Sequence, residues 1–190
     1  MWLWTISGTF AYESFQPTGI DMLKDFIETG KQKYPLADLR CIPFDRFVFS
    51  EKGFDIVILK DTIHHIFDES DIDEFWTGIR HVCRRRVIIM DPNPTLFLLL
   101  ARRLIKHVDP ICMPNQAKQS LANAGFSVVY QGYNEVLAFP LSGGFVGPPI
   151  VHKRLGFLIL TLDQILETLL AQLSLSEIFC WRYLIVADMV

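Results

Sequence analysis

The stretch from Phe54 to Ile66 constrains the fold of this chain more than any other part of the sequence. Its apolar run, Ile56 to Leu59, does not alternate with polar residues, and it stops abruptly at Lys60. An unbroken run of this kind is typical of a parallel strand that is buried on both faces. Ligands of open α/β sheets bind just beyond the carboxyl ends of such strands. The change at Lys60 therefore predicts a ligand site.

Strand-like and helix-like segments alternate along the rest of the chain, which predicts an α/β fold with helices on both faces of a mostly parallel sheet. A chain of 190 residues is expected to form one domain, here spanning residues 1–190, with residues 134–180 as an insert between the last two strands. The expected strands are 2–7, 17–21, 37–41, 54–59, 86–90, 126–131 and 181–187. The expected helices are 10–15, 22–33, 68–82, 95–107, 115–124 and 157–173.

Charge and cysteine usage exclude some classes of function. A net charge of −3 gives the chain no general attraction for nucleic acid. The four cysteines are scattered and form no C-x-x-C pair, which favours reduced, buried thiols over a zinc site or a disulfide framework. With no recognisable signal peptide and no segment typical of a transmembrane helix, we expect a cytoplasmic protein.

Three motifs follow three of the predicted strands or end them: Gly19-Ile20-Asp21, Asp38-Leu39, and Lys60-Asp61-Thr62 followed by Ile63-His64-His65-Ile66. Together they resemble the motifs of class I S-adenosyl-L-methionine (SAM)-dependent methyltransferases, in particular the methyltransferase type 11 domain, over roughly residues 8–188. The resemblance implies SAM as the cofactor and a Rossmann-like three-layer sandwich with a seven-stranded sheet. In that sheet the last strand is antiparallel and lies between the fifth and the sixth.

The resemblance assigns cofactor-binding roles to residues of these motifs. Asp21 would accept hydrogen bonds from the ribose hydroxyls of SAM, with Met22 beside it in the same site. Asp38 would accept a hydrogen bond from the adenine amine, and Leu39 would pack on the adenine ring. Lys60 lies where the family places groups near the methionine part of SAM. Because a lysine aimed at the sulfonium would repel it, we expect the Lys60 ammonium group to point away or to meet an acid.

Two of these acids have structural alternatives. Asp21 also fits an N-cap of the following helix, where a carboxylate satisfies unpaired backbone N–H groups. Asp38 also fits an ordinary surface aspartate that opens a loop.

The histidine pair, His64-His65, suggests metal binding or base catalysis at first sight. Adjacent residues on a helix point about 100° apart, so we expect no two-point metal clamp and predict no metal site. One histidine is expected to pack behind the SAM site, and the alternative is a general-base role for one of them.

The chain departs from the family at the glycine-rich turn after strand one. The family has an acid followed by Gly-x-Gly-x-Gly there, and this chain has only Ser7-Gly8-Thr9. Gly8 is the predicted contact for the aminoacyl end of SAM, since glycine allows close backbone approach. Gly19 follows only eleven positions later, which is short for a full crossover. Either the first strand is incomplete, or this loop has been remodelled.

We therefore predict a SAM-dependent methyltransferase that acts on a small, apolar or lipid-linked acceptor. The alternative is a non-catalytic remnant or scaffold of the same fold with impaired SAM binding. The predicted helices 95–107 and 157–173 are rich in leucine and would either cap the acceptor site or pack on the sheet. Residues 95–107 end in Arg102, Arg103 and Lys106, a pattern that also fits peripheral contact with an anionic membrane.

Overall fold

The computed structural model describes residues 16–44, 46, 53–69, 71–106, 108–144 and 149–190. The chain divides into two compact units, Met1–Lys52 and Gly53–Val190, and each is described here by itself. The expected strand 2–7, the expected helix 10–15 and Gly8 lie outside the described residues. The single domain over residues 1–190 stays a prediction.

The N-terminal unit is a small βαβ element. Strand β1 (Thr18–Asp21) pairs in parallel with β2 (Asp38–Cys41), and helix α2 (Lys24–Lys33) connects them. Leu39 is buried between β1 and α2, where a Cβ added at Gly19 or Gly30 would lie under 3 Å from its methyl groups. These two glycines therefore let Leu39 fill the space between strand and helix.

The C-terminal unit is built on a four-stranded sheet in the order β3-β4-β6-β5. Its strands are β3 (Phe54–Lys60), β4 (Cys83–Pro92), β5 (Phe126–Asn134) and β6 (Arg182–Met189). Strands β3 and β4 are parallel, whereas β6 runs antiparallel to both of its neighbours, β4 and β5. The predicted α/β class and the antiparallel last strand are confirmed, and the count of seven strands stays a prediction.

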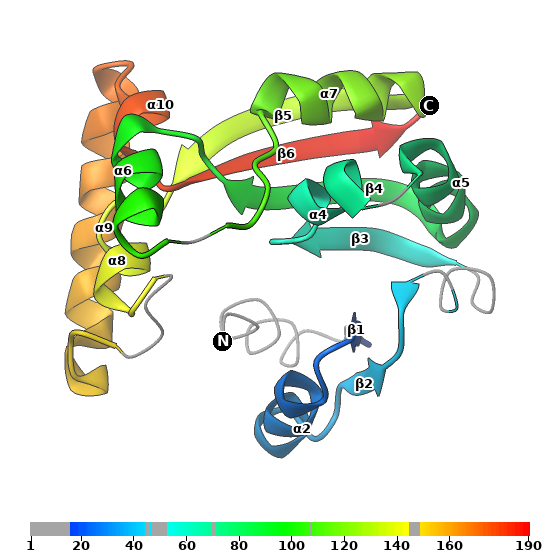
Figure 1. Ribbon diagram of the computed structural model, residues 1–190, viewed down its shortest axis with the longest axis horizontal. Coiled ribbons are helices and arrows are strands. Elements are labelled where there is room, and N and C mark those ends of the chain that lie inside the picture. The colour runs from blue at the N-terminus through cyan, green and yellow to red at the C-terminus, as the bar shows by residue number, and fades with distance from the viewer. Residues whose placement is uncertain (1–15, 45, 47–52, 70, 107, 145–148) are drawn as a thin grey trace. The chain divides into compact units, whose positions relative to one another are not determined.

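Helices α4 (Ile63–Glu69), α5 (Ile72–Val82) and α7 (Pro114–Asn123) cover one face of this sheet (Figure 1). Helices α5 and α7 are joined through Trp76, whose indole N–H donates to the hydroxyl of Ser120, and whose ring packs near Phe126. Arg80 extends the same contact by donating to the carbonyl of Ala124 at 2.8 Å. The core therefore lies between these helices and the sheet.

The predicted helix 68–82 is in fact two helices. Asp71 stands before α5, and its carboxylate accepts hydrogen bonds from the backbone N–H groups of Asp73 and Glu74. An aspartate in this role begins a new helix, because it satisfies donors that a continuous helix would have bonded internally. Helix α4, which carries the histidine pair, is therefore a separate element.

A second group of helices gathers at the end of the sheet where β3 and β4 finish (Figure 1). These are α6 (Leu96–Leu104), α8 (Ala138–Leu141), a short 3₁₀ helix (Lys153–Leu155), α9 (Gly156–Gln172) and α10 (Ser176–Phe179). All but α6 belong to the segment between β5 and β6. Within the described part of the chain, no helix has both the length and the apolar character needed to cross a bilayer.

Helix α6 offers a matched test of which side of it faces the core. Leu98 is fully buried, whereas Leu104, on the same helix, is 84% exposed. Leu98→Ala should lower the free energy of unfolding by about 2–5 kcal/mol, since it leaves a cavity. Leu104→Ala should change it by less than about 0.5 kcal/mol. Urea denaturation of both variants checks this, and equal losses would contradict the described packing.

Candidate functional site

The carboxyl end of β3 turns sharply at the residues that the sequence singles out. Lys60 ends the strand opposite Met90 of β4, and Asp61 follows it with a backbone φ of 50°. The Asp61 N–H donates to the Met90 carbonyl at 2.9 Å, and the Thr62 hydroxyl donates to the Lys60 carbonyl at 2.9 Å. These bonds hold the side chains of Lys60 and Asp61 at the sheet edge where ligands bind in open α/β folds.

A buried arginine ties this edge together. Arg182, at the start of β6, donates through its guanidinium to both carboxylate oxygens of Asp61. Its Nε donates to Oε2 of Glu135 at 2.8 Å. The guanidinium also lies 5.1 Å from the ring centroid of Phe139. Burial disfavours the charge of Arg182, but the two carboxylates outweigh burial and raise its pKa.

Both acids that pair with Arg182 adopt the left-handed backbone conformation. Asp61 has a φ of 50° and Glu135 a φ of 61°. This region is unfavourable for residues with a Cβ, at about 1–3 kcal/mol each, and it persists where surrounding contacts hold it. The two ion pairs of Arg182 are such contacts. Burial raises the pKa of Glu135, although Arg182 and Lys60 oppose the effect.

Lys60 lies beside this network. Burial and the charge of Arg182 lower its pKa, the charges of Asp61 and Glu135 raise it, and the net result is a pKa of about 8. A lysine with this pKa is partly neutral just above physiological pH. The expectation that Lys60 meets an acid therefore agrees with the charges that surround it.

A second buried pair joins the histidine motif to β4. Nδ1 of His64 lies 3.0 and 2.9 Å from the two carboxylate oxygens of Asp91, near the end of β4. Asp91 is fully buried, His64 is 5% exposed, and burial raises the pKa of Asp91. One histidine thus packs inside the protein, and its place behind a SAM site stays a prediction.

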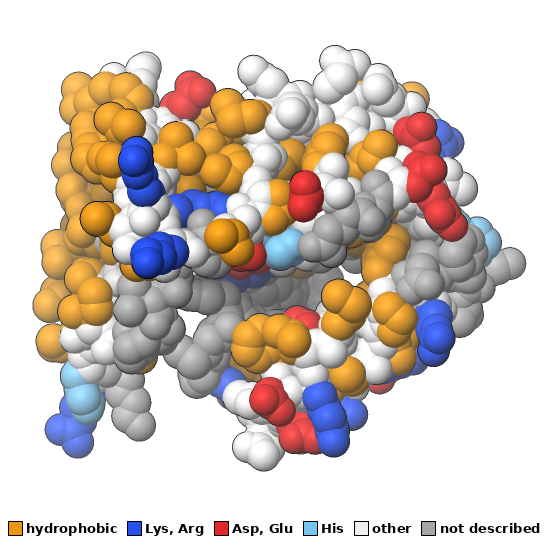
Figure 2. Space-filling model, in the orientation of Figure 1, with side chains coloured by type: hydrophobic (Ala, Val, Ile, Leu, Met, Phe, Trp, Pro, Cys, Tyr) orange, Lys and Arg blue, Asp and Glu red, His pale blue; other side chains and the backbone are white. Residues whose placement is uncertain are grey.

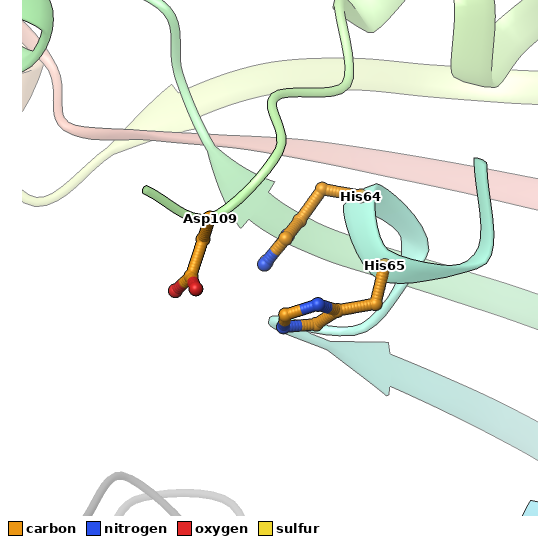
Figure 3. Close-up of side chains that lie close together, drawn as sticks. All are labelled: His64, His65 and Asp109. Atoms are coloured by element: carbon orange, nitrogen blue, oxygen red, sulfur yellow. The ribbon is translucent and has the colours of Figure 1, made fainter. Parts of the chain in front are cut away.

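His65 and Asp109 complete a group of metal-ligating side chain types around His64 (Figure 3). The potential ligand atoms of the three residues all lie within 4.8 Å of one another. The two histidine rings are 4.3 Å apart between centroids, so neighbouring positions on the helix have not splayed them apart. Because Asp91 engages Nδ1 of His64, Nε2 is the atom that could face a divalent cation, in the manner of metal-bound histidines. The absence of a metal site stays a prediction.

The N-terminal unit holds the remaining predicted cofactor contacts. Asp21 ends β1, and its Oδ1 accepts a hydrogen bond from the Leu23 N–H at 2.7 Å. The N-cap position of α2 is Leu23 and not Asp21, so the structure does not support the capping alternative, and this bond is a local turn that engages one carboxylate oxygen of two. Met22, beside it, is 72% exposed. Asp21 is the last residue of a parallel strand and Met22 follows it, which is the position of a ribose-binding acid.

Asp38 lies at the other end of the strand pair. It opens β2 and pairs with Thr18, whereas Asp21 pairs with Cys41. Arg40 donates from Nε and Nη2 to Oδ2 of Asp38 at 3.0 and 2.6 Å, and this bond lowers the pKa of Asp38. The resemblance expects an acid at the carboxyl end of its strand, so this position does not support the adenine role. That role, like the ring contact of the buried Leu39, stays a prediction.

Sequence reasoning missed Arg182, Glu135 and Asp91 as members of the site. A charged residue inside the apolar run 181–187 was the available signal for Arg182, because a buried charge needs a partner.

A shallow depression of about 700 Å³ lies elsewhere, between α7 and β5, and residues such as Asn115, Lys118 and Val128 line it. Lys60, the predicted site residue of the C-terminal unit, does not contribute to it.

Comparison with known proteins agrees with this architecture. Residues 7–90 match a family model described as a methyltransferase domain. No curated protein sequence matches the chain in the corresponding search. Three solved structures illustrate the likeness, and at these identities each shows the fold alone.

The first is a SAM-dependent methyltransferase from Archaeoglobus fulgidus, 18% identical, covering 96% of this chain and 80% of that one, with a TM-score of 0.65. The second is a SAM-dependent methyltransferase from Methanosarcina mazei, 13% identical, covering 98% and 87%, with a TM-score of 0.60. The third is magnesium protoporphyrin IX methyltransferase from Synechocystis with bound SAH, 12% identical, covering 95% and 66%, with a TM-score of 0.58.

The Arg182 network predicts a stability effect that depends on pH. Arg182→Met leaves two carboxylates without their partner and should cost about 3–5 kcal/mol at neutral pH. The folded-state pKa of Glu135 is raised above its ordinary value of 4.5, so the neutral form is favoured in the fold. The stability that this gives is fully present at low pH and is lost as pH rises. Because Arg182 lowers the pKa of Glu135, its removal raises that pKa further, and the variant loses more stability than the wild type as pH rises. The deficit of the variant should therefore be smallest near pH 4 and should grow toward neutrality.

Urea denaturation of Arg182→Met across this pH range measures the effect. Arg86→Met is the matched control, because Arg86 pairs with Asp188 in a partly exposed ion pair and should cost much less. A loss for Arg182→Met that is no larger than the control, or that does not vary with pH, would contradict the buried network.

Proposed function

We propose that this chain, whose residues 7–90 match a methyltransferase domain and whose fold is that of SAM-dependent methyltransferases, transfers a methyl group from SAM to a small acceptor that is apolar or lipid-linked. The observation that carries the proposal is the order β3-β4-β6-β5 with β6 antiparallel, together with polar residues at the carboxyl ends of β1 and β3. We also propose a cytoplasmic location, which four free cysteines support.

We propose that residues at these strand ends contact different parts of SAM. Asp21 has one carboxylate oxygen committed to Leu23, and its geometry supports a ribose contact through the other, with Met22 alongside. Gly8 would approach the aminoacyl end, and Lys60 would lie near the methionine part. Asp38 and Leu39 remain proposed adenine contacts on the strength of the resemblance.

Little acid–base chemistry is needed for the proposed reaction. SAM supplies a methyl group that is activated by the positive charge on its sulfur. The protein must align the acceptor atom with that methyl group and keep water out, and positioning of this kind can supply much of a rate enhancement. The role of the chain is therefore to hold two ligands in line, and we name no catalytic residue.

The Asp21 assignment predicts a loss of affinity without a loss of stability. Asp21→Ala should weaken SAM binding by about 1.5–3 kcal/mol, the size of lost charge-assisted hydrogen bonds. This is roughly a ten- to hundredfold rise in Kd. Asp25→Ala, in the exposed first turn of α2, is the control and should bind like the wild type. Isothermal titration calorimetry measures both, and unchanged affinity of Asp21→Ala would remove the assignment.

Lys60 predicts how SAM binding depends on pH. Its pKa of about 8 means that its charge disappears as pH rises from 7 to 9, which removes a repulsion toward the sulfonium. The affinity for SAM, divided by that for S-adenosylhomocysteine, should therefore be higher at pH 9 than at pH 7. S-adenosylhomocysteine carries the same amino and carboxylate groups and lacks the charged sulfonium. In Lys60→Met this difference should vanish. The same pH dependence in wild type and variant would place Lys60 away from the sulfur.

The reduced glycine turn around Gly8 favours one alternative, a non-catalytic remnant or scaffold with impaired SAM binding. Titration of SAM, S-adenosylhomocysteine and adenosine against the same preparation separates the two functions. An enzyme should prefer the two ligands that carry the amino acid, with SAM binding in the micromolar range. Binding of adenosine as tight as that of SAM would favour the remnant, and no heat from any ligand would defeat the enzyme.

A further inference from the structure

Helix α9 exposes its large apolar side chains, whereas an ordinary surface helix buries them against the core. Its one buried residue is an acid, Asp163. Large apolar side chains of the same helix remain about half exposed or more: Phe157, Leu158, Leu160, Leu162, Ile165 and Leu169. The structure thus does not support the expectation that residues 157–173 pack on the sheet through their apolar side.

The two acids of α9 both serve the loop that follows β5. Asp163 accepts hydrogen bonds from the backbone N–H groups of Val136, at 2.9 Å, and Leu137. Glu167 accepts one from the N–H of Glu135 at 2.6 Å. Asp163 and Glu167 are the only charged residues in the helix, so its outward side carries no charge.

Helical spacing gives this outward side a continuous apolar stripe. Leu158, Leu162, Ile165 and Leu169 follow one another at intervals of four, three and four residues, which places them on one side of a helix. Asp163 and Glu167 are four residues apart and lie roughly on the opposite side. The helix of seventeen residues is about 25 Å long, and the stripe from Leu158 to Leu169 covers about 17 Å of it.

Helices α6 and α10 continue the apolar surface. Phe97 of α6 stacks on Phe179 of α10, with 5.7 Å between ring centroids. On the same helix, three leucines are each at least half exposed: Leu96, Leu100 and Leu104. We call the exposed apolar side chains of α6, α9 and α10 the α6–α9 surface. Figure 2 shows hydrophobic side chains gathered over these helices, with basic side chains among them.

The charges that border this surface are mainly basic. Arg103 and Lys106 are exposed at the end of α6, and Arg154 is exposed just before α9. Arg102, in contrast, turns inward and donates to the carbonyls of Asp109 and Pro110. Glu177 of α10 is an exposed acid. An apolar surface that is bordered by basic residues is the pattern of helices that lie in the interface of an anionic bilayer.

We propose that the α6–α9 surface docks this chain on an anionic lipid surface, with α9 lying flat in the interface. The docked surface would bring a lipid-linked acceptor to the end of the sheet where β3 and β4 finish, and this role rests on the proposed function. It also extends the predicted membrane contact of residues 95–107 to the helix 157–173, which was expected either to cap the acceptor site or to pack on the sheet.

Vesicle co-sedimentation of the full chain tests the proposal. The probes are phosphatidylcholine vesicles with and without phosphatidylglycerol, at low and at high salt. We expect binding to the anionic vesicles that weakens as salt rises, because screening reduces the contribution of the basic residues. The double variant Leu158→Glu/Ile165→Glu should bind at least about tenfold more weakly, since it places two charges in the apolar stripe.

Two further variants make the test specific. Val129→Glu is the control, because Val129 is 53% exposed on β5 and lies outside the surface. It should bind vesicles like the wild type. Arg103→Gln/Lys106→Gln should lose the preference for anionic vesicles and keep α9 intact. Circular dichroism of each variant confirms that it folds, and the substituted side chains are exposed.

The outcomes separate docking from its alternatives and from the proposed reaction. Equal binding by the α9 double variant and the wild type would overturn the proposal. So would the absence of vesicle binding, and sedimentation equilibrium would then show whether the same variant disrupts a dimer, in which case a second copy covers the surface. SAM titration is measured without vesicles, so a failure of SAM binding and a failure of docking are distinguishable.

Discussion

The buried guanidinium of Arg182 holds the functional edge of the C-terminal unit together. Through its ion pairs the start of β6 is fixed to the turn after β3, at Asp61, and to the turn after β5, at Glu135. A buried charge is tolerated only when its partners are complete, so all three chain segments must take their places together. Both acidic partners accept an unfavourable backbone conformation to do so. The charges of this network also act on the pKa of the neighbouring Lys60.

Much of the sheet could be predicted from the sequence, because local patterns specify it. The apolar run before Lys60, the helix start at Thr95 and the apolar run after Cys180 all fall where the structure has β3, α6 and β6. The partners of Arg182 could not be predicted, since Asp61 lies 121 positions away and no local pattern links the two. The expected strand 37–41 places Asp38 at the amino end of its strand, where β2 has it, whereas the motif gives it the role of an acid at the carboxyl end. The pattern of a strand and the resemblance of a motif therefore point to different roles for the same residue.

Helix α9 shows a different limit of sequence patterning. An amphipathic pattern predicts two sides of a helix, and we expect the apolar side to face the core. Here three backbone N–H groups at residues 135–137 need acceptors, and the acids of α9 satisfy them. Unpaired buried N–H groups would lower the free energy of unfolding more than exposed aliphatic side chains do. The exposed side chains can still be buried against a lipid surface. Which side faces inward was therefore decided by the loop and not by the helix.

The central position of β6 has a consequence for how the chain reaches its fold. Strand β6 lies between β4 and β5, both of which precede it in the sequence, and its pairing with β4 joins residues about one hundred positions apart. Contacts of such long sequence separation form slowly, because the chain must first lose the entropy of a large loop. Until β6 enters, β4 and β5 each present an unpaired edge, and such edges attract other chains. The growing sheet therefore passes through a stage that is prone to aggregation, in which protection by a chaperone would help most.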